Sequence, residues 1–176
     1  MEKGLIIVYT GNGKGKTTAA LGLVLRAIGY KQKVCMIQFI KGSWHYGEMY
    51  SANILKPEFE LVAAGKGFVG IIDDSTPLIE HKKIAQHAIE ICKKKIQSNK
   101  YNTVILDEIN YAINMKLIKL DDLIKIINSK PYEQNLVLTG NYVKNKIIDL
   151  ADIVTEMKEI KHPFKFGIKA KKGIDF

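Results

Sequence analysis

Residues 10–18 read Thr-Gly-Asn-Gly-Lys-Gly-Lys-Thr-Thr, and this stretch decides the fold. A continuous apolar run, Leu5–Thr10, leads into it and is typical of a buried parallel strand. Helix-forming residues follow from Lys16 to Ile28, and Gly29 is a typical helix stop. Three glycines within five positions allow backbone N–H groups to turn inward, and the start of the helix adds unpaired donors. The order of strand, glycine-rich loop and helix therefore predicts a site for the phosphates of a nucleotide.

This loop is a variant of the P-loop pattern G-x-x-x-x-G-K-[ST], which binds nucleotide phosphates. Gly15, Lys16 and Thr17 match the end of the pattern, whereas Thr10 stands where its first glycine is usual. We expect the Lys16 side chain to contact the phosphates and the Thr17 hydroxyl to bind Mg²⁺. The alternative is a glycine-rich turn that precedes a helix by chance. The predicted nucleotide-binding residues of the loop are Thr10, Gly11, Asn12, Gly13, Lys14, Gly15, Lys16, Thr17 and Thr18.

Two carboxylates follow another strand-like run and complete the predicted metal site. The run Thr103–Leu106 leads directly into Asp107 and Glu108. Parallel strands end at the same edge of a sheet, where nucleotide-binding crevices lie. Carboxylate and hydroxyl oxygens suit Mg²⁺, so we expect Thr17, Asp107 and Glu108 to be its ligands. The alternative is an acidic turn between a strand and a helix.

The rest of the chain alternates strand-like and helical segments. Apolar runs typical of buried strands are expected at 34–40, 59–63, 103–106, 135–139 and 153–157. Helices are expected at 16–28, 77–98, 120–128 and 144–150, and residues 41–58 are predicted to be irregular. Apolar strands that alternate with helices predict an α/β fold, a three-layer, RecA-like P-loop domain with a mostly parallel central sheet. No repeat or linker divides the chain, so residues 1–176 are expected to form one domain.

Length and composition agree with a globular domain and exclude several other classes. The chain has 176 residues, of which 47% are hydrophobic and 26% charged, so it is neither disordered nor fibrous. No apolar run reaches the roughly 18 residues that span a bilayer, and no membrane partner is expected. The first residues lack the apolar segment of a signal peptide, and Cys35 and Cys92 do not make a disulfide framework. We therefore expect a reduced, cytoplasmic protein.

Positive charge is the unusual feature of the composition. Lysine and arginine number 27 against 18 acidic residues, which gives a net charge of +9 and suits anionic partners. Arg26 is the only arginine, however, and nucleic-acid recognition relies on arginine. Most lysines are therefore expected on solvated faces, and no nucleic-acid partner is expected. Arg26, near the end of the first predicted helix, is predicted either to contact the nucleotide or to form a structural ion pair.

Three further segments narrow the class of nucleotide-binding protein. They are residues 34–42 with Trp44, Gly65-Lys66-Gly67-Phe68, and the tail at 161–176, which ends in Lys171-Lys172-Gly173-Ile174-Asp175-Phe176. Thr139-Gly140-Asn141 and Asp149-Leu150-Ala151-Asp152 add to the pattern. Together with the loop at 10–18 and Leu-Asp-Glu-Ile-Asn-Tyr at 106–111, they resemble the P-loop-type ATP:corrinoid adenosyltransferases. The resemblance extends from Gly4 to Phe176.

The resemblance implies an enzyme that transfers the 5′-deoxyadenosyl group of Mg-ATP to the cobalt(I) of a corrinoid. Triphosphate is released, and the reaction serves the biosynthesis or salvage of adenosylcobalamin. Cobalt(I) is a strong nucleophile that carries no proton, so no general base is required. The protein has to align the substrates and stabilise charge on the triphosphate. Lys16 and Glu108 are therefore expected catalytic residues, with Lys14 beside them.

The resemblance also implies aromatic side chains that cover the lower face of the corrin ring and make the cobalt easier to reduce. Phe68 matches the phenylalanine of the family segment G-x-G-F-T-W and is the third expected catalytic residue. Gly70 stands where that segment has its tryptophan, and Trp44 is the candidate for the corrinoid pocket. The alternative for both aromatic residues is that they are ordinary residues of the core. Lys41 and Trp44 complete the predicted cofactor-binding residues.

The expected partners are ATP, a corrinoid, a flavodoxin-like reductant and a second copy of the chain, as the family implies. Lysines at 82–83 and 93–95 are expected either to be solvated or to dock the acidic reductant. Two other functions stay open from the residues themselves. One is a nucleic-acid-stimulated ATPase that forms ADP and phosphate, and the other is a nucleotide-binding regulator or corrinoid carrier without turnover.

Overall fold

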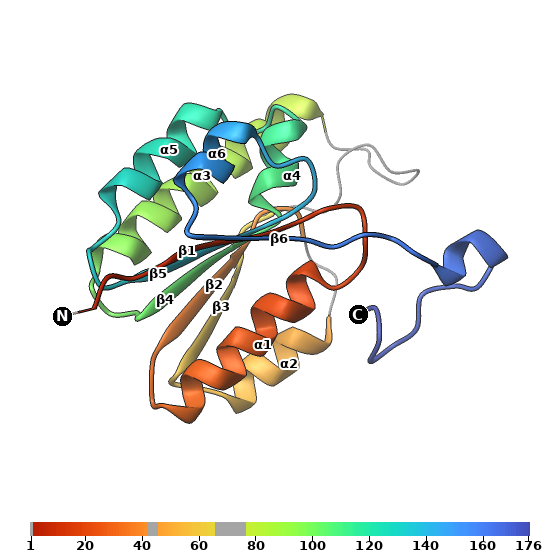
Figure 1. Cartoon of the computed structure of the whole chain (residues 1–176), viewed down its shortest axis with the longest axis horizontal. Coiled ribbons are helices and arrows are strands. Elements are labelled where there is room, and N and C mark those ends of the chain that lie inside the picture. Colours follow the sequence, from red (N-terminus) through yellow and green to blue (C-terminus); the bar gives the residue numbers. More distant parts are fainter. Residues whose placement is uncertain (1, 42–45, 66–76) are drawn as a thin grey trace.

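Six parallel strands form the centre of the computed structural model, which describes residues 2–41, 46–65 and 77–176. The strands lie in the order β3-β2-β4-β5-β1-β6, and every adjacent pair is parallel. Their bounds are β1 (Ile6–Thr10), β2 (Val34–Gln38), β3 (Phe59–Ala63), β4 (Thr103–Asp107), β5 (Asn135–Thr139) and β6 (Ile153–Glu156). The predicted α/β fold is confirmed (Figure 1).

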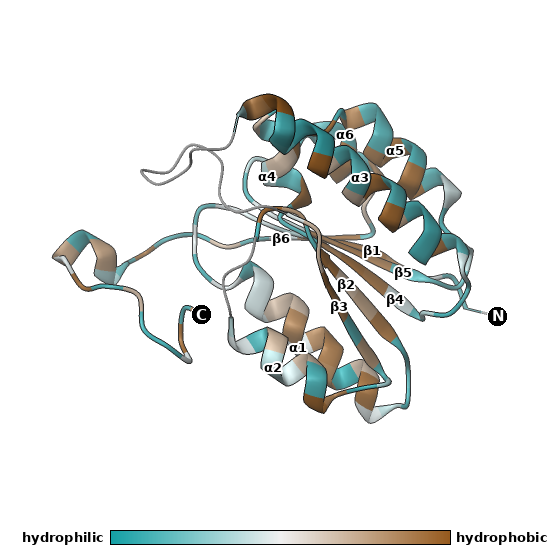
Figure 2. Ribbon diagram, turned by 180° about the vertical axis from the view of Figure 1, so that it is seen from behind, coloured by the Kyte–Doolittle hydropathy of each residue, from teal (hydrophilic) through white to brown (hydrophobic). Residues whose placement is uncertain are grey.

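Helices cover both faces of the sheet, which gives three layers (Figure 1). One face carries α1 (Lys16–Gly29) and α2 (Gly47–Ile54), and the other carries α3 (Leu78–Gln97), α4 (Ile109–Asn114), α5 (Leu120–Ser129) and α6 (Asn145–Leu150). The central strands are almost continuously hydrophobic, as expected for strands that are covered on both faces (Figure 2). Among the described residues, no helix combines the length and hydropathy that crossing a bilayer requires.

The strand residues alternate between two hydrophobic cores, one on each side of the sheet. In β2, Cys35 and Ile37 belong to the core beneath α3 and α5, whereas Val34 and Met36 belong to the core beneath α1. This alternation follows from the two-residue period of a strand. At the edge of the sheet, β6 is exposed along its whole length.

The sequence-based prediction missed two helices near the carboxyl edge of the sheet. Residues 47–54, predicted to be irregular, form α2, whose first turn contains Glu48, a charge that favours a helix start. Ala52 is the only buried residue of this helix, so its sequence shows no clear periodic pattern. The second missed helix, α4, has six residues and follows Glu108 directly. In addition, β2 ends at Gln38, before the predicted end of the strand at residue 40.

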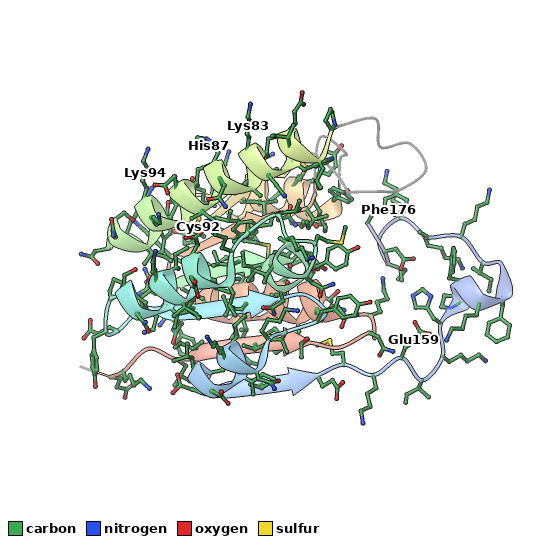
Figure 3. The ribbon with its side chains drawn as sticks, turned by 90° about the horizontal axis from the view of Figure 1, so that it is seen from above. Lys83, His87, Cys92, Lys94, Glu159 and Phe176 are labelled. Carbon is green, nitrogen blue, oxygen red and sulfur yellow. The ribbon has the colours of Figure 1, made fainter. Side chains whose placement is uncertain are left out.

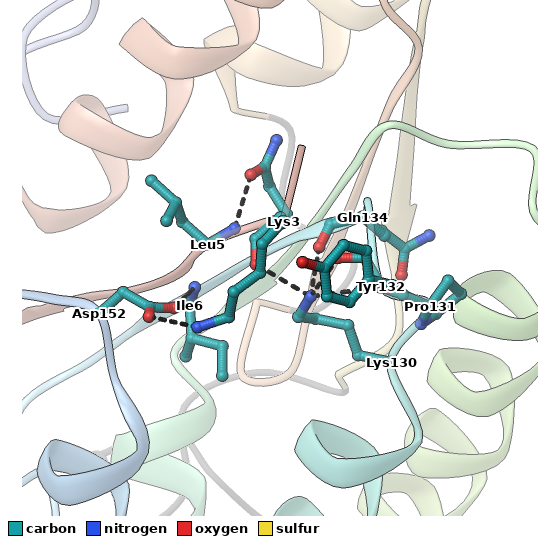
Figure 4. Close-up of polar contacts among 10 residues, drawn as sticks. Lys3, Leu5, Ile6, Lys130, Pro131, Tyr132, Gln134 and Asp152 are labelled. Carbon is teal, nitrogen blue, oxygen red and sulfur yellow. Dashed lines mark hydrogen bonds and ion pairs between the residues drawn. The ribbon is translucent and has the colours of Figure 1, made fainter. Parts of the chain in front are cut away.

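At the amino ends of the strands, Lys130 joins the start of the chain to the segment before β5 (Figure 4). Lys130 Nζ donates to the carbonyl oxygens of Gly4 at 3.1 Å, Pro131 at 3.2 Å, Tyr132 at 3.4 Å and Gln134 at 2.7 Å. Partial burial lowers the pKa of Lys130. The four carbonyl groups therefore replace the water that this ammonium group has lost.

A second contact at this edge holds β6 beside β1 (Figure 4). Asp152 Oδ2 accepts from the backbone N–H of Ile6 at 2.8 Å, and its Oδ1 accepts from Lys3 Nζ at 2.8 Å. The hydrogen bond from Lys3 lowers the pKa of Asp152. The last residue of the Asp149–Asp152 motif thus has a structural role, at the end of β1 away from the glycine loop.

Replacing Lys130 with Met is expected to lower the free energy of unfolding by about 2 kcal/mol, because partly buried carbonyl groups lose a charged donor. Urea unfolding at neutral pH measures this loss. Lys125→Met is the matched control, since Lys125 is an exposed lysine of α5. An equal loss of stability in both variants would contradict the role assigned to Lys130.

Candidate active site

The glycine loop takes its shape from the segment that follows β6. Gly11 and Gly15 have φ angles of 96° and 113°, in the region that favours glycine. A Cβ atom on Gly11 would lie 2.3 Å from the carbonyl oxygen of Met157, so a larger residue does not fit there. The backbone N–H of Gly13 donates to the same oxygen at 2.7 Å. The loop and the chain after β6 are therefore packed backbone against backbone.

Lys16, the first residue of α1, lies across the loop. Its Nζ donates to the carbonyl oxygens of Gly11 at 2.9 Å and Gly13 at 2.8 Å. The charge of Lys16 also acts on Glu108, which lines the same cavity. A lysine ammonium group, loop N–H groups and a helix N-terminus thus meet at one place, which is suited to an anion.

Asp107, the last residue of β4, is a fully buried carboxylate with three side-chain donors. Its Oδ1 accepts from Thr17 Oγ1 at 2.9 Å and from Thr139 Oγ1 at 2.8 Å, and its Oδ2 accepts from Gln38 Nε2 at 3.2 Å. Burial raises the pKa of Asp107, whereas the hydrogen bonds act in the opposite direction. Asp107 therefore ties β4 to α1, β5 and β2 at the carboxyl edge of the sheet.

Glu108 follows in a left-handed backbone conformation, with a φ angle of 62°. Its backbone N–H donates to Thr139 Oγ1 at 2.9 Å, so one hydroxyl contacts both acidic residues. Gly140 lets the chain pass close to this corner: a Cβ atom there would lie 2.9 Å from the backbone nitrogen of Tyr111 and 3.2 Å from Glu108 Oε2. The Thr139-Gly140 pair therefore shapes the wall from which Glu108 enters the cavity.

The carboxyl group of Glu108 carries a strongly shifted pKa. Burial and the neighbouring charge of Asp107 raise the pKa of Glu108 to about 7, although Lys16 and Lys41 act to lower it. A bound divalent cation would favour the charged form, because it places positive charge beside the carboxylate. Glu108 thus fits a metal ligand better than a permanent ion-pair partner.

Oxygen atoms suited to magnesium lie close together in this part of the site. Thr17 Oγ1 and Asp107 Oδ1 are 2.9 Å apart, and Glu108 lines the cavity beside them. Mg²⁺ prefers hard oxygen ligands and retains water and phosphate oxygens, so it needs few protein ligands. The residues present therefore fit this ion.

A chain of hydrogen bonds leads from Asp107 through Gln38 to Glu48 and Lys41. Gln38 Nε2 donates to Asp107 Oδ2 and to Glu48 Oε1, each at 3.2 Å. Glu48 Oε1 also accepts from Lys41 Nζ, which lies 4.5 Å from the centre of the Tyr46 ring. Although burial acts to raise it, the pKa of Glu48 is lowered by these donors, Lys41 first. Lys41 is thus held in place from two sides at the wall of the cavity.

One cavity of about 580 Å³ joins these groups. Its polar end consists of the loop and first turn at 14–18 together with Lys41, Glu48 and Glu108. Its apolar walls come from α1, α2 and the start of β3, through Leu21, Val24, Leu25, Leu55 and Phe59. The end of the chain, residues 173–176, closes another side. The cavity therefore offers an anion site that is continuous with an apolar surface.

The structure places the predicted site residues unequally. The cavity is lined by Lys14, Gly15, Lys16, Thr17, Thr18, Lys41 and Glu108, with Asp107 beneath it. Asn12 instead accepts a hydrogen bond from the backbone N–H of Glu159 at 3.1 Å, which fixes the loop, and Thr10 is buried in β1. Phe68 and Trp44 lie outside the described residues.

Arg26, for which the sequence left open a contact with the nucleotide or a structural ion pair, lies away from the glycine loop. It lies in the last turn of α1, ten residues after Lys16, and so about 15 Å from it along the helix axis. It does not line the cavity. The rise of the helix per residue, counted from the glycine loop, would already have placed Arg26 away from that loop.

Three residues of the site were not predicted: Gln38, Glu48 and Thr139. Gln38 and Thr139 belong to segments that carry the family resemblance, but a single polar residue at the end of a strand does not reveal a partner elsewhere in the sequence. Their positions at the carboxyl ends of β2 and β5, level with Asp107, are the signal that could have found them.

Glu108→Gln is expected to stabilise the metal-free protein at pH 8 by up to about 3 kcal/mol and to have little effect at pH 5. The folded protein favours the protonated carboxyl, so charging Glu108 destabilises the fold progressively as the pH rises from 4.5 to about 7. Urea unfolding at both pH values measures the difference. Glu133→Gln, at an exposed glutamate, is the control, and an equal gain at both pH values would contradict this explanation.

Comparisons with known proteins bear on the whole chain. The model of the family described as ATP:corrinoid adenosyltransferase BtuR/CobO/CobP matches residues 2–176. The chain is 38% identical over 178 residues to the corrinoid adenosyltransferase of Escherichia coli (strain K12), covering 99% of this chain and 87% of that protein. It is also 38% identical over 179 residues to the corrinoid adenosyltransferase CobA of Salmonella typhimurium (strain LT2), with the same coverage of both.

A solved structure with the same kind of fold is the KaiC-like protein PH0186 from Pyrococcus horikoshii OT3. Its TM-score is 0.54 at 14% sequence identity, and the match covers 90% of this chain and 75% of that chain. This likeness concerns the fold alone. The family match and the curated relatives, which extend over almost every residue, confirm the resemblance seen in the motifs. The chain belongs to the ATP:corrinoid adenosyltransferase family.

Proposed function

We propose that this chain transfers the 5′-deoxyadenosyl group of Mg-ATP to the cobalt(I) of a corrinoid and releases triphosphate. The observation that carries the proposal is the cavity of about 580 Å³ in which the glycine loop adjoins apolar walls. The loop suits the triphosphate, and the walls around Leu21, Leu25 and Leu55 suit the less polar parts of the substrates. Membership of the family supplies the reaction class.

In this reaction the triphosphate is the leaving group. Loop N–H groups with Lys14 and Lys16 stabilise the negative charge that develops as the bond between C5′ and the α-phosphate oxygen breaks. Mg²⁺, held by Thr17, Asp107 and Glu108, would supply further positive charge there. Because C5′ has to meet the cobalt, the ribose end of the nucleotide faces the second substrate. A kinase would present the terminal phosphate instead.

The reaction requires no side-chain nucleophile. Cobalt(I) attacks with its own electron pair, and no proton has to be removed from it. Both cysteines are free and lie in the core, where burial raises the pKa of Cys35 to about 12 and that of Cys92 well above its ordinary value. Their thiols are therefore suited to packing, and the protein contributes alignment and charge.

The corrinoid contacts and the partners belong to the proposal as well. We assign Phe68 and Trp44 to the corrinoid face because of their places in the family motifs. Lys83 and Lys94 point away from the domain on α3, which supports the docking of an acidic, flavodoxin-like reductant (Figure 3). The family resemblance supports a homodimer and a cytoplasmic location.

Incubation with ATP, Mg²⁺ and chemically reduced cob(I)alamin is expected to yield adenosylcobalamin and triphosphate in equal amounts. Lys16→Ala should lower the rate about 10²–10³-fold, because a charge that stabilises the leaving group is lost. Lys146→Ala, at an exposed lysine of α6, is the matched control and should leave the rate unchanged. Visible spectroscopy follows the corrinoid, and ion chromatography identifies the phosphates.

Other products would point to other functions. ADP and inorganic phosphate, formed faster in the presence of nucleic acid, would favour a nucleic-acid-stimulated ATPase. Tight binding of ATP or corrinoid without any product would favour a regulator or carrier. Either result would overturn the proposed transfer.

A further inference from the structure

The end of the chain returns to the phosphate loop. After β6 the chain leaves the sheet and passes through a short 3-10 turn at Pro163–Phe166. It then returns toward the ends of α1 and α2 that lie next to the glycine loop (Figure 1). Residues 173–176 then line the same cavity as the loop. A Cβ atom on Gly47, at the start of α2, would lie 3.8 Å from the carbonyl carbon of Phe176. The chain end therefore forms part of the site. This gives the motif at 171–176 a structural place that the family resemblance alone did not assign to it.

A tight turn presents one carboxylate from this segment to the loop. The backbone N–H groups of Lys171 and Asp175 donate at 2.8 Å to Asp175 Oδ2 and to the Lys171 carbonyl oxygen, respectively. Gly173, with a φ angle of 78°, donates its N–H to the Phe176 carbonyl oxygen at 2.8 Å. Asp175 Oδ1 is left free by these bonds to contact another group. The turn thus fixes the direction in which Asp175 points.

The partner of Asp175 Oδ1 is the ammonium group of Lys14, 161 residues away in the sequence. Both side chains are only partly exposed, at 43% for Lys14 and 23% for Asp175. Lys14 belongs to the glycine loop and lines the cavity. A triphosphate in that loop and the Asp175 carboxylate are both anions, and both would contact the same lysine.

We propose that Asp175 is a positioning residue that competes with the triphosphate for Lys14. The ion pair with Lys14 is present while the loop contains no phosphate, breaks when ATP binds and forms again as the product leaves. This inference rests on the proposed function, which places the triphosphate in the loop. The expected benefit is at product release, because an anion that takes over one contact of the product weakens its binding, and weaker binding appears mainly as faster dissociation.

Asp175→Asn separates the charge of this residue from its role in the turn. The Asn side-chain oxygen still accepts from the Lys171 N–H, whereas the charge beside Lys14 is lost. We expect inorganic triphosphate with Mg²⁺ to bind about two- to fivefold more tightly to this variant, as expected for a partly exposed ion pair. Calorimetry measures the affinity. In turnover, the same change should lower the inhibition constant of triphosphate, with little effect on the KM for the corrinoid.

The matched control is Glu90→Gln, which removes another partly exposed ion pair, the one with Lys93 on α3, and should leave triphosphate affinity unchanged. In a Lys14→Gln background, Asp175→Asn should have no further effect on affinity. Unchanged or weaker binding by Asp175→Asn alone, or equal tightening in the Lys14→Gln background, would overturn the inference. Failure of the wild-type protein to bind triphosphate at all would overturn the proposed function as well.

Discussion

The buried carboxylate of Asp107 is the constraint on which the site depends. A charge that has lost its water is tolerated only where donors surround it, and Thr17, Thr139 and Gln38 supply them. Each donor comes from a different element, so satisfying one carboxylate fixes α1, β5 and β2 relative to β4. The same contacts place the Thr17 hydroxyl and Glu108 at the carboxyl ends of the strands, where the glycine loop leads into α1.

From Asp107 the polar contacts continue in one direction. Gln38 connects it to Glu48, and Glu48 holds Lys41 at the cavity wall. Lys41, one of the positive groups that line the cavity, is thereby held in place by an acidic neighbour. Such support keeps donors in place before the substrate arrives, which is the condition under which charge stabilisation is most effective.

Most of the fold was predictable because strands that are buried on both faces appear in the sequence as apolar runs. The bounds of β3 and β5 agree with those runs at both ends. By contrast, α2 has one buried residue and could not be recognised from periodicity. Local pattern therefore suffices where burial is continuous and fails where an element is held mainly by its neighbours.

The site divides in a similar way. The loop and the two carboxylates were predictable because their chemistry lies within a few consecutive residues. Gln38 and Thr139 were not, since their partner Asp107 is 69 and 32 residues away and appears only when the strands are aligned. The roles of Asn12 and Arg26 depend on the same three-dimensional information, because one contacts the chain after β6 and the other lies at the far end of α1.

The packing of the glycine loop against Met157 has a consequence for biosynthesis of the chain. The loop lies near the start of the sequence, but the oxygen that accepts from Gly13 belongs to a residue more than 140 positions later. A nascent chain on the ribosome thus cannot give the loop this shape until β6 and the residues after it have emerged. The observed shape of the glycine loop is therefore acquired only after all six strands of the sheet have been synthesised.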